Sequence, residues 1–117
     1  MVANVRAVPS GRVRQLRMLL GLSRERMARM LDVSTKTVER WEAADAQPSS
    51  NATRERLALL AEIVELGLLV YGQDGLPEFV ATPLPEFGGR TAAKLIEVGQ
   101  GEQVLAALAA DYEGLGA

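Results

Sequence analysis

The 117-residue chain carries 13 lysines and arginines against 15 aspartates and glutamates, and it contains no histidine and no cysteine. The missing cysteine excludes disulfides and thiolate chemistry, and the missing histidine removes the usual general base and metal ligand, so most enzyme classes are disfavoured. Apolar residues make up 48% of the chain but aromatic residues only 4%, which favours a helical globular domain over a β-sandwich.

The charge is divided unevenly along the chain. Residues 1–42 hold nine basic and four acidic residues, whereas residues 43–117 hold four basic and eleven acidic residues. A basic N-terminal part indicates a polyanionic partner such as nucleic acid, and the acidic remainder indicates a different partner. Segregation of surface charge by chance is the alternative interpretation.

Neither a membrane span nor a signal peptide is predicted. Glu62 and Glu65 interrupt the best apolar run before it reaches the roughly 20 residues that a membrane span requires. The arginine-rich N-terminus has no apolar stretch before a cleavage site. We therefore expect a cytoplasmic protein without a membrane partner.

The first predicted helix follows Pro9-Ser10-Gly11. Val13, Leu16 and Leu20 recur at helical spacing, and Gly21 ends the segment. Two short helices are predicted next. Ser23 is placed to cap the first of them, and Ser34 is placed to cap the second, which runs to about Ala44.

The rest of the chain reads as further helices separated by turns. A polar linker at 44–51 precedes the longest predicted helix, at about 53–71. A turn at Gly72–Gly75, a short helix near 76–81 and a Pro- and Gly-rich loop at 82–89 follow, and Thr91 and Gly101 begin the last two helices. No strand pattern competes with these helices, so the predicted fold is all-α.

Residues 23–42 carry the strongest local pattern. Two short helices separated by a three-residue turn can pack closely if the crossing residue is small, and Ala28 meets that requirement. The shared core would consist of Met27, Leu31, Val33, Val38 and Trp41. At 100° per residue, Lys36 and Arg40 point away from Val38 and therefore away from this core.

This segment resembles the helix-turn-helix of the Cro/phage-repressor-like (Xre) class. Asp32 stands where the class usually has Gly, and Asp tolerates a left-handed turn; Arg24 stands where the class often has Gln. The resemblance implies operator double-stranded DNA as a partner. The predicted DNA-binding residues are Ser23, Arg24, Ser34, Thr35, Lys36, Thr37 and Arg40. A structural helical hairpin with a solvated basic face is the alternative.

The long helix carries two apolar stripes. One consists of Leu57, Leu60, Ala61, Val64 and Leu68, and the other of Leu59, Ile63, Leu66 and Val70. Two stripes exceed what one small domain usually covers on a surface helix. We predict a homodimer that uses Leu59, Ile63, Leu66 and Val70, and the alternative is a helix central to its own fold.

The C-terminal third carries a second resemblance. Its Thr82-Pro83 step, its Gly88-Gly89-Arg90-Thr91 turn and its leucine-rich last helix ending near Glu113-Gly114 are similar to the toxin-binding domain of the Xre/MbcA/ParS antitoxins. Together the two resemblances cover nearly the whole chain. They imply a helix-turn-helix domain at residues 1–50 and a helical dimerisation and toxin-binding domain at residues 51–117.

The resemblance implies an antitoxin of a type II toxin–antitoxin pair. Such antitoxins occlude the active site of a RES-domain toxin that consumes NAD, or of a related ADP-ribosylating toxin, and they repress their own operon. The chain itself would hold no cofactor and perform no chemistry. The predicted toxin-binding residues are Pro83, Leu84, Phe87, Gly88, Gly89, Arg90, Asp111, Tyr112, Glu113 and Leu115.

Two other functions stay open at this point. One is a stand-alone transcriptional regulator whose acidic domain senses a ligand or only dimerises. The other is an enzyme that uses Asp or Glu pairs, although no carboxylate constellation stands out from the solvated helix faces.

Overall fold

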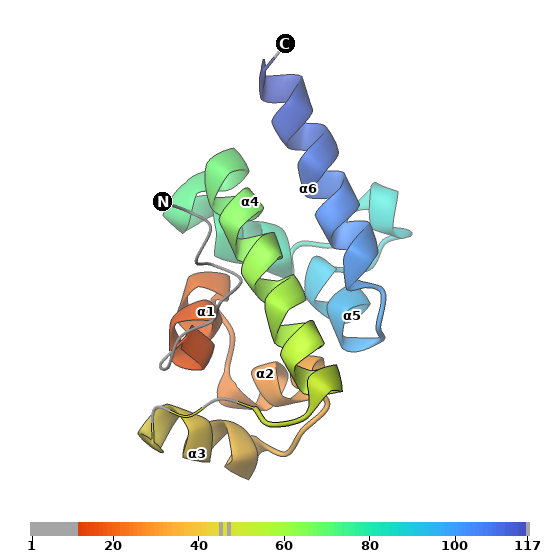
Figure 1. Ribbon diagram of the computed structural model, residues 1–117. Coiled ribbons are helices and arrows are strands. Elements are labelled where there is room, and N and C mark those ends of the chain that lie inside the picture. Colours follow the sequence, from red (N-terminus) through yellow and green to blue (C-terminus); the bar gives the residue numbers. More distant parts are fainter. Residues whose placement is uncertain (1–11, 45, 47, 117) are drawn as a thin grey trace.

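The computed structural model describes residues 12–44, 46 and 48–116 (Figure 1). In chain order the elements are α1 (Arg12–Leu20), α2 (Arg24–Leu31), α3 (Thr35–Ala44), α4 (Asn51–Ala81), the 3-10 helix η2 (Pro85–Phe87), α5 (Ala92–Glu97) and α6 (Gly101–Gly116). Within these described residues there is no strand, so the all-α prediction is confirmed. The expected start at Pro9–Gly11 and linker residues 45 and 47 lie outside the described residues.

The helix N-termini follow the capping residues of the sequence. The side chain of Ser23 accepts a hydrogen bond from the backbone N–H of Arg26, and the side chain of Thr91 accepts one from that of Lys94. Each cap satisfies one of the N–H groups that a first helical turn leaves unpaired. The predicted starts of α2 and α5 are therefore confirmed.

The long helix α4 is central to the fold. It packs against α1 along one side and against α6 along the other (Figure 1). Leu57, Leu60 and Ala61 from one predicted stripe are fully buried, and so is Ile63 from the other. The two stripes exist because α4 has neighbours on two sides within the same molecule. This is the alternative to dimerisation that the sequence left open, a helix central to its own fold.

The path of α4 changes at Gly72. This residue has φ 76° and ψ 178°, a conformation that is almost restricted to glycine, while helical hydrogen bonding resumes after it and continues to Ala81. The sequence predicted a helix from about 53, a turn over Gly72–Gly75 and a separate helix near 76–81. Helix α4 instead begins at Asn51, where the side chain of Ser50 accepts a hydrogen bond from Thr53 N–H, and the turn shrinks to a kink at one residue.

Replacement of Gly72 with Ala is expected to lower the free energy of unfolding by about 1–3 kcal/mol, because a Cβ strains this backbone conformation. No neighbouring atom lies within 4 Å of such a Cβ, so strain is the whole cause. The matched control is Gly114→Ala on the exposed end of α6, which should raise stability by about 0.5–1 kcal/mol. Urea titration of both variants measures the difference, and an unchanged midpoint for Gly72→Ala would contradict this account.

One apolar core joins the two parts of the chain. It includes Leu16 and Val38 from the N-terminal helices, Leu60 from α4, and Leu95 and Leu108 from α5 and α6. Burial of each such side chain contributes about 1.5–3 kcal/mol. The division at residue 50 stays a prediction, and the two parts on either side of it share this core. None of the helices in the described part of the chain is long and apolar enough to span a membrane.

Candidate functional site

The turn between α2 and α3 has the conformation that the sequence predicted. Asp32 adopts the left-handed conformation with φ 59° and ψ 48°, and its backbone N–H donates to the carbonyl of Arg29 at 3.2 Å. Ala28 is 2% exposed where the two helices cross. The small side chain and the left-handed residue together bring α3 across α2 in a helix-turn-helix.

The predicted core of this motif forms as expected. Met27, Leu31 and Val38 are fully buried, Trp41 is buried, and Val33 packs against the same cluster. The N-terminus of α3 is capped by Ser34, whose Oγ accepts from the Thr37 N–H at 3.1 Å and lies 2.9 Å from the Thr37 Oγ1. These contacts fix the direction of α3 relative to α2.

The outer face of α3 carries two exposed cations. Lys36 and Arg40 are one helical turn apart and both are exposed, while Thr35 and Thr37, on either side of Lys36, are half-buried. Residues at the N-terminal end of such a second helix meet base edges when the helix enters the major groove. An arginine or lysine there is suited to the paired acceptors of guanine.

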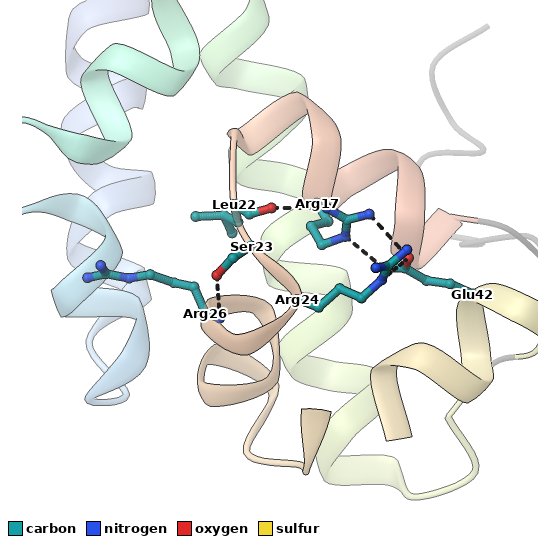
Figure 2. Close-up of polar contacts among 6 residues, drawn as sticks. All are labelled: Arg17, Leu22, Ser23, Arg24, Arg26 and Glu42. Carbon is teal, nitrogen blue, oxygen red and sulfur yellow. Dashed lines mark hydrogen bonds and ion pairs between the residues drawn. The ribbon is translucent and has the colours of Figure 1, made fainter. Parts of the chain in front are cut away.

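A buried carboxylate connects α3 to the other helices of the motif (Figure 2). Arg17 donates through Nε to Oε2 of Glu42 at 2.8 Å and through Nη2 to Oε1 at 3.2 Å, while its Nη1 donates to the carbonyl of Leu22 at 3.1 Å. Arg24 donates through Nε to Oε1 of Glu42 at 3.0 Å. The Glu42 side chain is only 4% exposed, so this ion pair is part of the interior that holds α3 in place.

The environment of Glu42 favours its charged form. Burial on its own would raise the pKa of Glu42, but the hydrogen bonds and positive charges of Arg17 and Arg24 outweigh burial and hold this pKa below the ordinary value of 4.5. Sequence analysis missed this role of Arg17 and Glu42. They lie 25 positions apart, and no local spacing pairs them.

Two of the predicted DNA contacts have structural partners within the chain. Ser23 caps α2, and Arg24 is drawn toward Glu42 although its side chain is 47% exposed (Figure 2). A phosphate contact by Arg24 stays a prediction, and it would be made by a guanidinium that is already paired with a carboxylate. Lys36 and Arg40 on α3 are therefore the principal candidates.

The loop at residues 83–91, which we call the Gly-Gly loop, closes on itself. Leu84 N–H donates to the Arg90 carbonyl at 3.2 Å, and Gly89 N–H donates to the Leu84 carbonyl at 2.9 Å. Gly88 and Gly89 have φ values of 67° and 82°, which glycine adopts without strain. These bonds give the loop a fixed shape on the surface.

Several predicted toxin-binding residues are exposed on the Gly-Gly loop. Pro83, Gly88, Gly89 and Arg90 are exposed. The Nη2 of Arg90 donates to the Oε1 of Gln100 at 3.2 Å, which connects the loop to the turn between α5 and α6. Leu84 is half-buried against the core.

Phe87 does not belong to this surface. Its side chain is 5% exposed and lies edge-on to the ring of Phe79, with the centroids 6.2 Å apart. The Phe79 ring stacks in turn on Tyr71 at 4.8 Å. The prediction of Phe87 as a toxin contact is wrong, because its ring anchors the Gly-Gly loop to the core.

The C-terminal segment, residues 109–116, continues α6 to Gly116 and projects away from the other helices (Figure 1). The sequence placed the end of this helix near Glu113-Gly114, and Ala117 lies outside the described residues. Tyr112 and Leu115 are 47% and 64% exposed, and Glu113 is exposed as well. An exposed helix end with two apolar side chains is available to a partner.

Asp111 has a partner in the same chain. It is half-buried, and its Oδ2 accepts a hydrogen bond from the Tyr71 hydroxyl at 3.2 Å. Burial, followed by the charge and hydrogen bond of Asp111, raises the pKa of Tyr71 above 10.0, so the hydroxyl keeps its proton and donates. Sequence analysis missed Tyr71 because it lies 40 residues from Asp111.

The predicted dimer contacts are not arranged as one exposed stripe. Ile63 is 0% exposed within a single chain, so its prediction as a dimer contact is wrong. Leu59 and Leu66 pack against the core of the same chain, and Val70 is half-buried. These side chains are directed toward the neighbours of α4, and the face of α4 that is open to solvent lies elsewhere.

Another ion pair joins the helix-turn-helix to the C-terminal half. Nε of Arg26 on α2 lies 2.6 Å from Oε2 of Glu97 on α5, and Nε of Arg29 lies 3.6 Å from the same oxygen. The Glu97 side chain is 10% exposed. The contact fixes α5 against α2 and was not evident from the sequence.

The part of the chain that the structure describes contains no candidate metal site. No group of three histidine, cysteine, aspartate or glutamate side chains there could hold a metal ion. The surfaces described above are suited to binding.

Comparison with known proteins agrees with the geometry of the motif. A family described as helix-turn-helix matches residues 13–66, which include α1 to α3 and the first half of α4. A comparison with curated proteins gives no match. The chain is also similar to a chain in the crystal structure of the M. tuberculosis MbcT–MbcA toxin–antitoxin complex, with a TM-score of 0.70 and 28% sequence identity. This similarity covers 88% of the present chain and 92% of the other.

These two matches together support an Xre/MbcA-type antitoxin. The resemblance stated from the sequence is thereby confirmed. The match extends over both parts of the chain, so the antitoxin shares the helix-turn-helix and also the arrangement of α4 to α6 that follows it.

Proposed function

We propose that this antitoxin binds and occludes a RES-domain toxin that consumes NAD, or a related ADP-ribosylating toxin. The observation that carries the proposal is the similarity to a chain of the MbcT–MbcA toxin–antitoxin complex, which extends over 88% of the present chain. The toxin performs the chemistry in the cytoplasm, and the antitoxin itself catalyses no reaction.

The proposed toxin-binding surface has two parts. The C-terminal segment offers Tyr112 and Leu115 as exposed apolar anchors with Glu113 beside them. The Gly-Gly loop offers a fixed backbone with Arg90 exposed. An acidic and apolar helix end is suited to a cleft that otherwise holds the phosphates of a dinucleotide, because carboxylates can pair with phosphate-binding cations.

The proposal includes repression of the antitoxin's own operon through the helix-turn-helix. Lys36 and Arg40 would read base edges or hold phosphates in the major groove. A homodimer would place two copies of α3 on two half-sites of the operator, about one helical turn of DNA apart.

Alanine at Lys36 or at Arg40 is expected to weaken operator binding. Loss of a base contact costs about 1–3 kcal/mol and relaxes specificity at one position, whereas loss of a phosphate contact lowers affinity for all sequences and flattens the salt dependence. Fluorescence anisotropy at several salt concentrations distinguishes the two cases. Lys94→Ala, which removes an exposed cation from α5, is the control and should bind like the wild type. If both α3 variants retain wild-type affinity, α3 does not enter the groove.

Co-expression with the neighbouring open reading frame tests the function as a whole. Cells that express the neighbouring protein alone are expected to stop growing and to lose NAD, and the antitoxin should restore both and co-purify with it. A neighbour that is harmless, or that does not bind the antitoxin, would favour a stand-alone regulator. If growth stops while the NAD level is preserved, the antitoxin function still holds but the partner does not consume NAD.

A further inference from the structure

A surface groove between α1 and the open side of α4 belongs to neither proposed binding surface. Met18 on α1 and Leu69 on α4 are 60% and 59% exposed, among the most exposed large apolar side chains in the described residues. Leu19 and Leu68 beside them are only partly covered. An apolar patch of this kind on a small protein indicates an interaction site.

The same face is hollowed along its length. One cavity of about 540 Å³ is lined by residues that include Met18, Leu19 and Asp74. An adjoining cavity of about 440 Å³ is lined by residues that include Leu19, Glu65 and Leu69. Gln15 and Leu19 line both cavities, so the two form one continuous groove.

The two walls of the groove carry opposite charges. The α1 wall contributes Arg12 and Arg14, and the α4 wall contributes Glu65 and Asp74. A two-fold axis that runs along the groove would place the basic wall of one copy against the acidic wall of the other, whereas an axis across the groove would bring like charges together. In such an isologous contact each complementary pair occurs twice. The charge pattern therefore favours a second copy of the same chain over a partner with a single sign of charge.

We propose that the α1–α4 groove is the face through which two copies of this antitoxin pair. The inference rests on the homodimer of the proposed function and assigns its surface. Neither α3 nor the C-terminal segment contributes a residue to the groove, so pairing leaves the proposed operator and toxin contacts accessible. The groove also replaces the predicted interface through Ile63, which is buried.

Analytical ultracentrifugation of the full chain at micromolar concentration tests the pairing. The wild type is expected at twice the 12.6 kDa mass of one chain. Met18→Glu and Leu69→Glu should each raise the dimer dissociation constant roughly 30-fold or more, because a charge replaces an apolar contact at the centre of the interface. The matched control is Val98→Glu, which places the same charge at an exposed apolar position near α6 and should leave the mass unchanged.

Charge exchange tests the two-fold arrangement independently. Arg14→Glu and Asp74→Arg should each weaken the dimer, and the double variant should regain it, because the exchanged charges meet across the interface. Failure of this rescue would overturn the two-fold pairing.

The remaining outcomes test the proposed interface and the existence of the homodimer separately. A wild-type monomer would refute the homodimer itself. A dimer that survives both Met18→Glu and Leu69→Glu would keep the homodimer and reject this face.

Discussion

An antitoxin that ends at Asp111 is expected to fold and to bind its operator, but to lose toxin neutralisation. The truncation retains the hydrogen bond from Tyr71 to Asp111, so α6 stays fixed against α4. It removes Tyr112, Glu113 and Leu115, which are exposed at the end of α6. Growth of cells that express the toxin, together with co-purification of the two proteins, measures the loss.

Point variants show whether the truncation acts by removing side-chain contacts with the toxin or by shortening α6. Tyr112→Ala combined with Leu115→Ala should weaken capture by at least roughly 30-fold if both are central anchors. Val98→Ala removes an apolar side chain of similar exposure elsewhere and should bind like the wild type. Full neutralisation by the truncated chain would place the toxin contact on the Gly-Gly loop and α5.

Loss of the Glu42 carboxylate is expected to destabilise the helix-turn-helix strongly. Glu42→Ala leaves the Arg17 guanidinium, 15% exposed, without its counter-charge in the interior. Removal of one partner of a buried ion pair costs about 3–5 kcal/mol. The control is Glu39→Ala on the same helix, where the side chain is exposed and the expected change is within about 0.5 kcal/mol.

The exposure of Arg24 predicts a smaller loss of stability there than at Glu42. Arg24→Ala should cost at most about 1 kcal/mol, because its side chain is 47% exposed and solvent screens the pair. Denaturant titrations of Glu42→Ala, Arg24→Ala and Glu39→Ala give the order of their stability losses directly. Equal losses for Glu42→Ala and Glu39→Ala would contradict a structural role for the buried pair.

The same carboxylate predicts a pH dependence of stability. Because the pKa of Glu42 in the folded chain lies below its ordinary value of 4.5, the unfolded chain binds the proton more readily. The contribution of Glu42 is therefore complete above pH 4.5 and is lost as the pH falls through the folded pKa. Wild-type stability should decline in that acidic range more steeply than the stability of the Glu42→Ala variant.

Local sequence determined the helices and the motif of this protein. Ser23, Ser34 and Thr91 marked helix starts because a side-chain oxygen there reaches an unpaired N–H two or three residues ahead. Asp32 marked the left-handed turn, and helical periodicity placed Lys36 and Arg40 on the outer face of α3. Each of these inferences depends on interactions within about one helical turn, which spacing in the chain reveals.

Only the tertiary structure decided which apolar and charged residues meet. The two stripes of α4 looked alike in the sequence, and burial of Ile63 follows from having α1 and α6 on either side. Phe87 looked exposed in a Gly-rich loop but fills a place beside Phe79. The pairs Arg17 with Glu42 and Tyr71 with Asp111 join positions 25 and 40 residues apart. Periodicity describes the faces of one helix, whereas the neighbour of each face depends on how the whole chain packs.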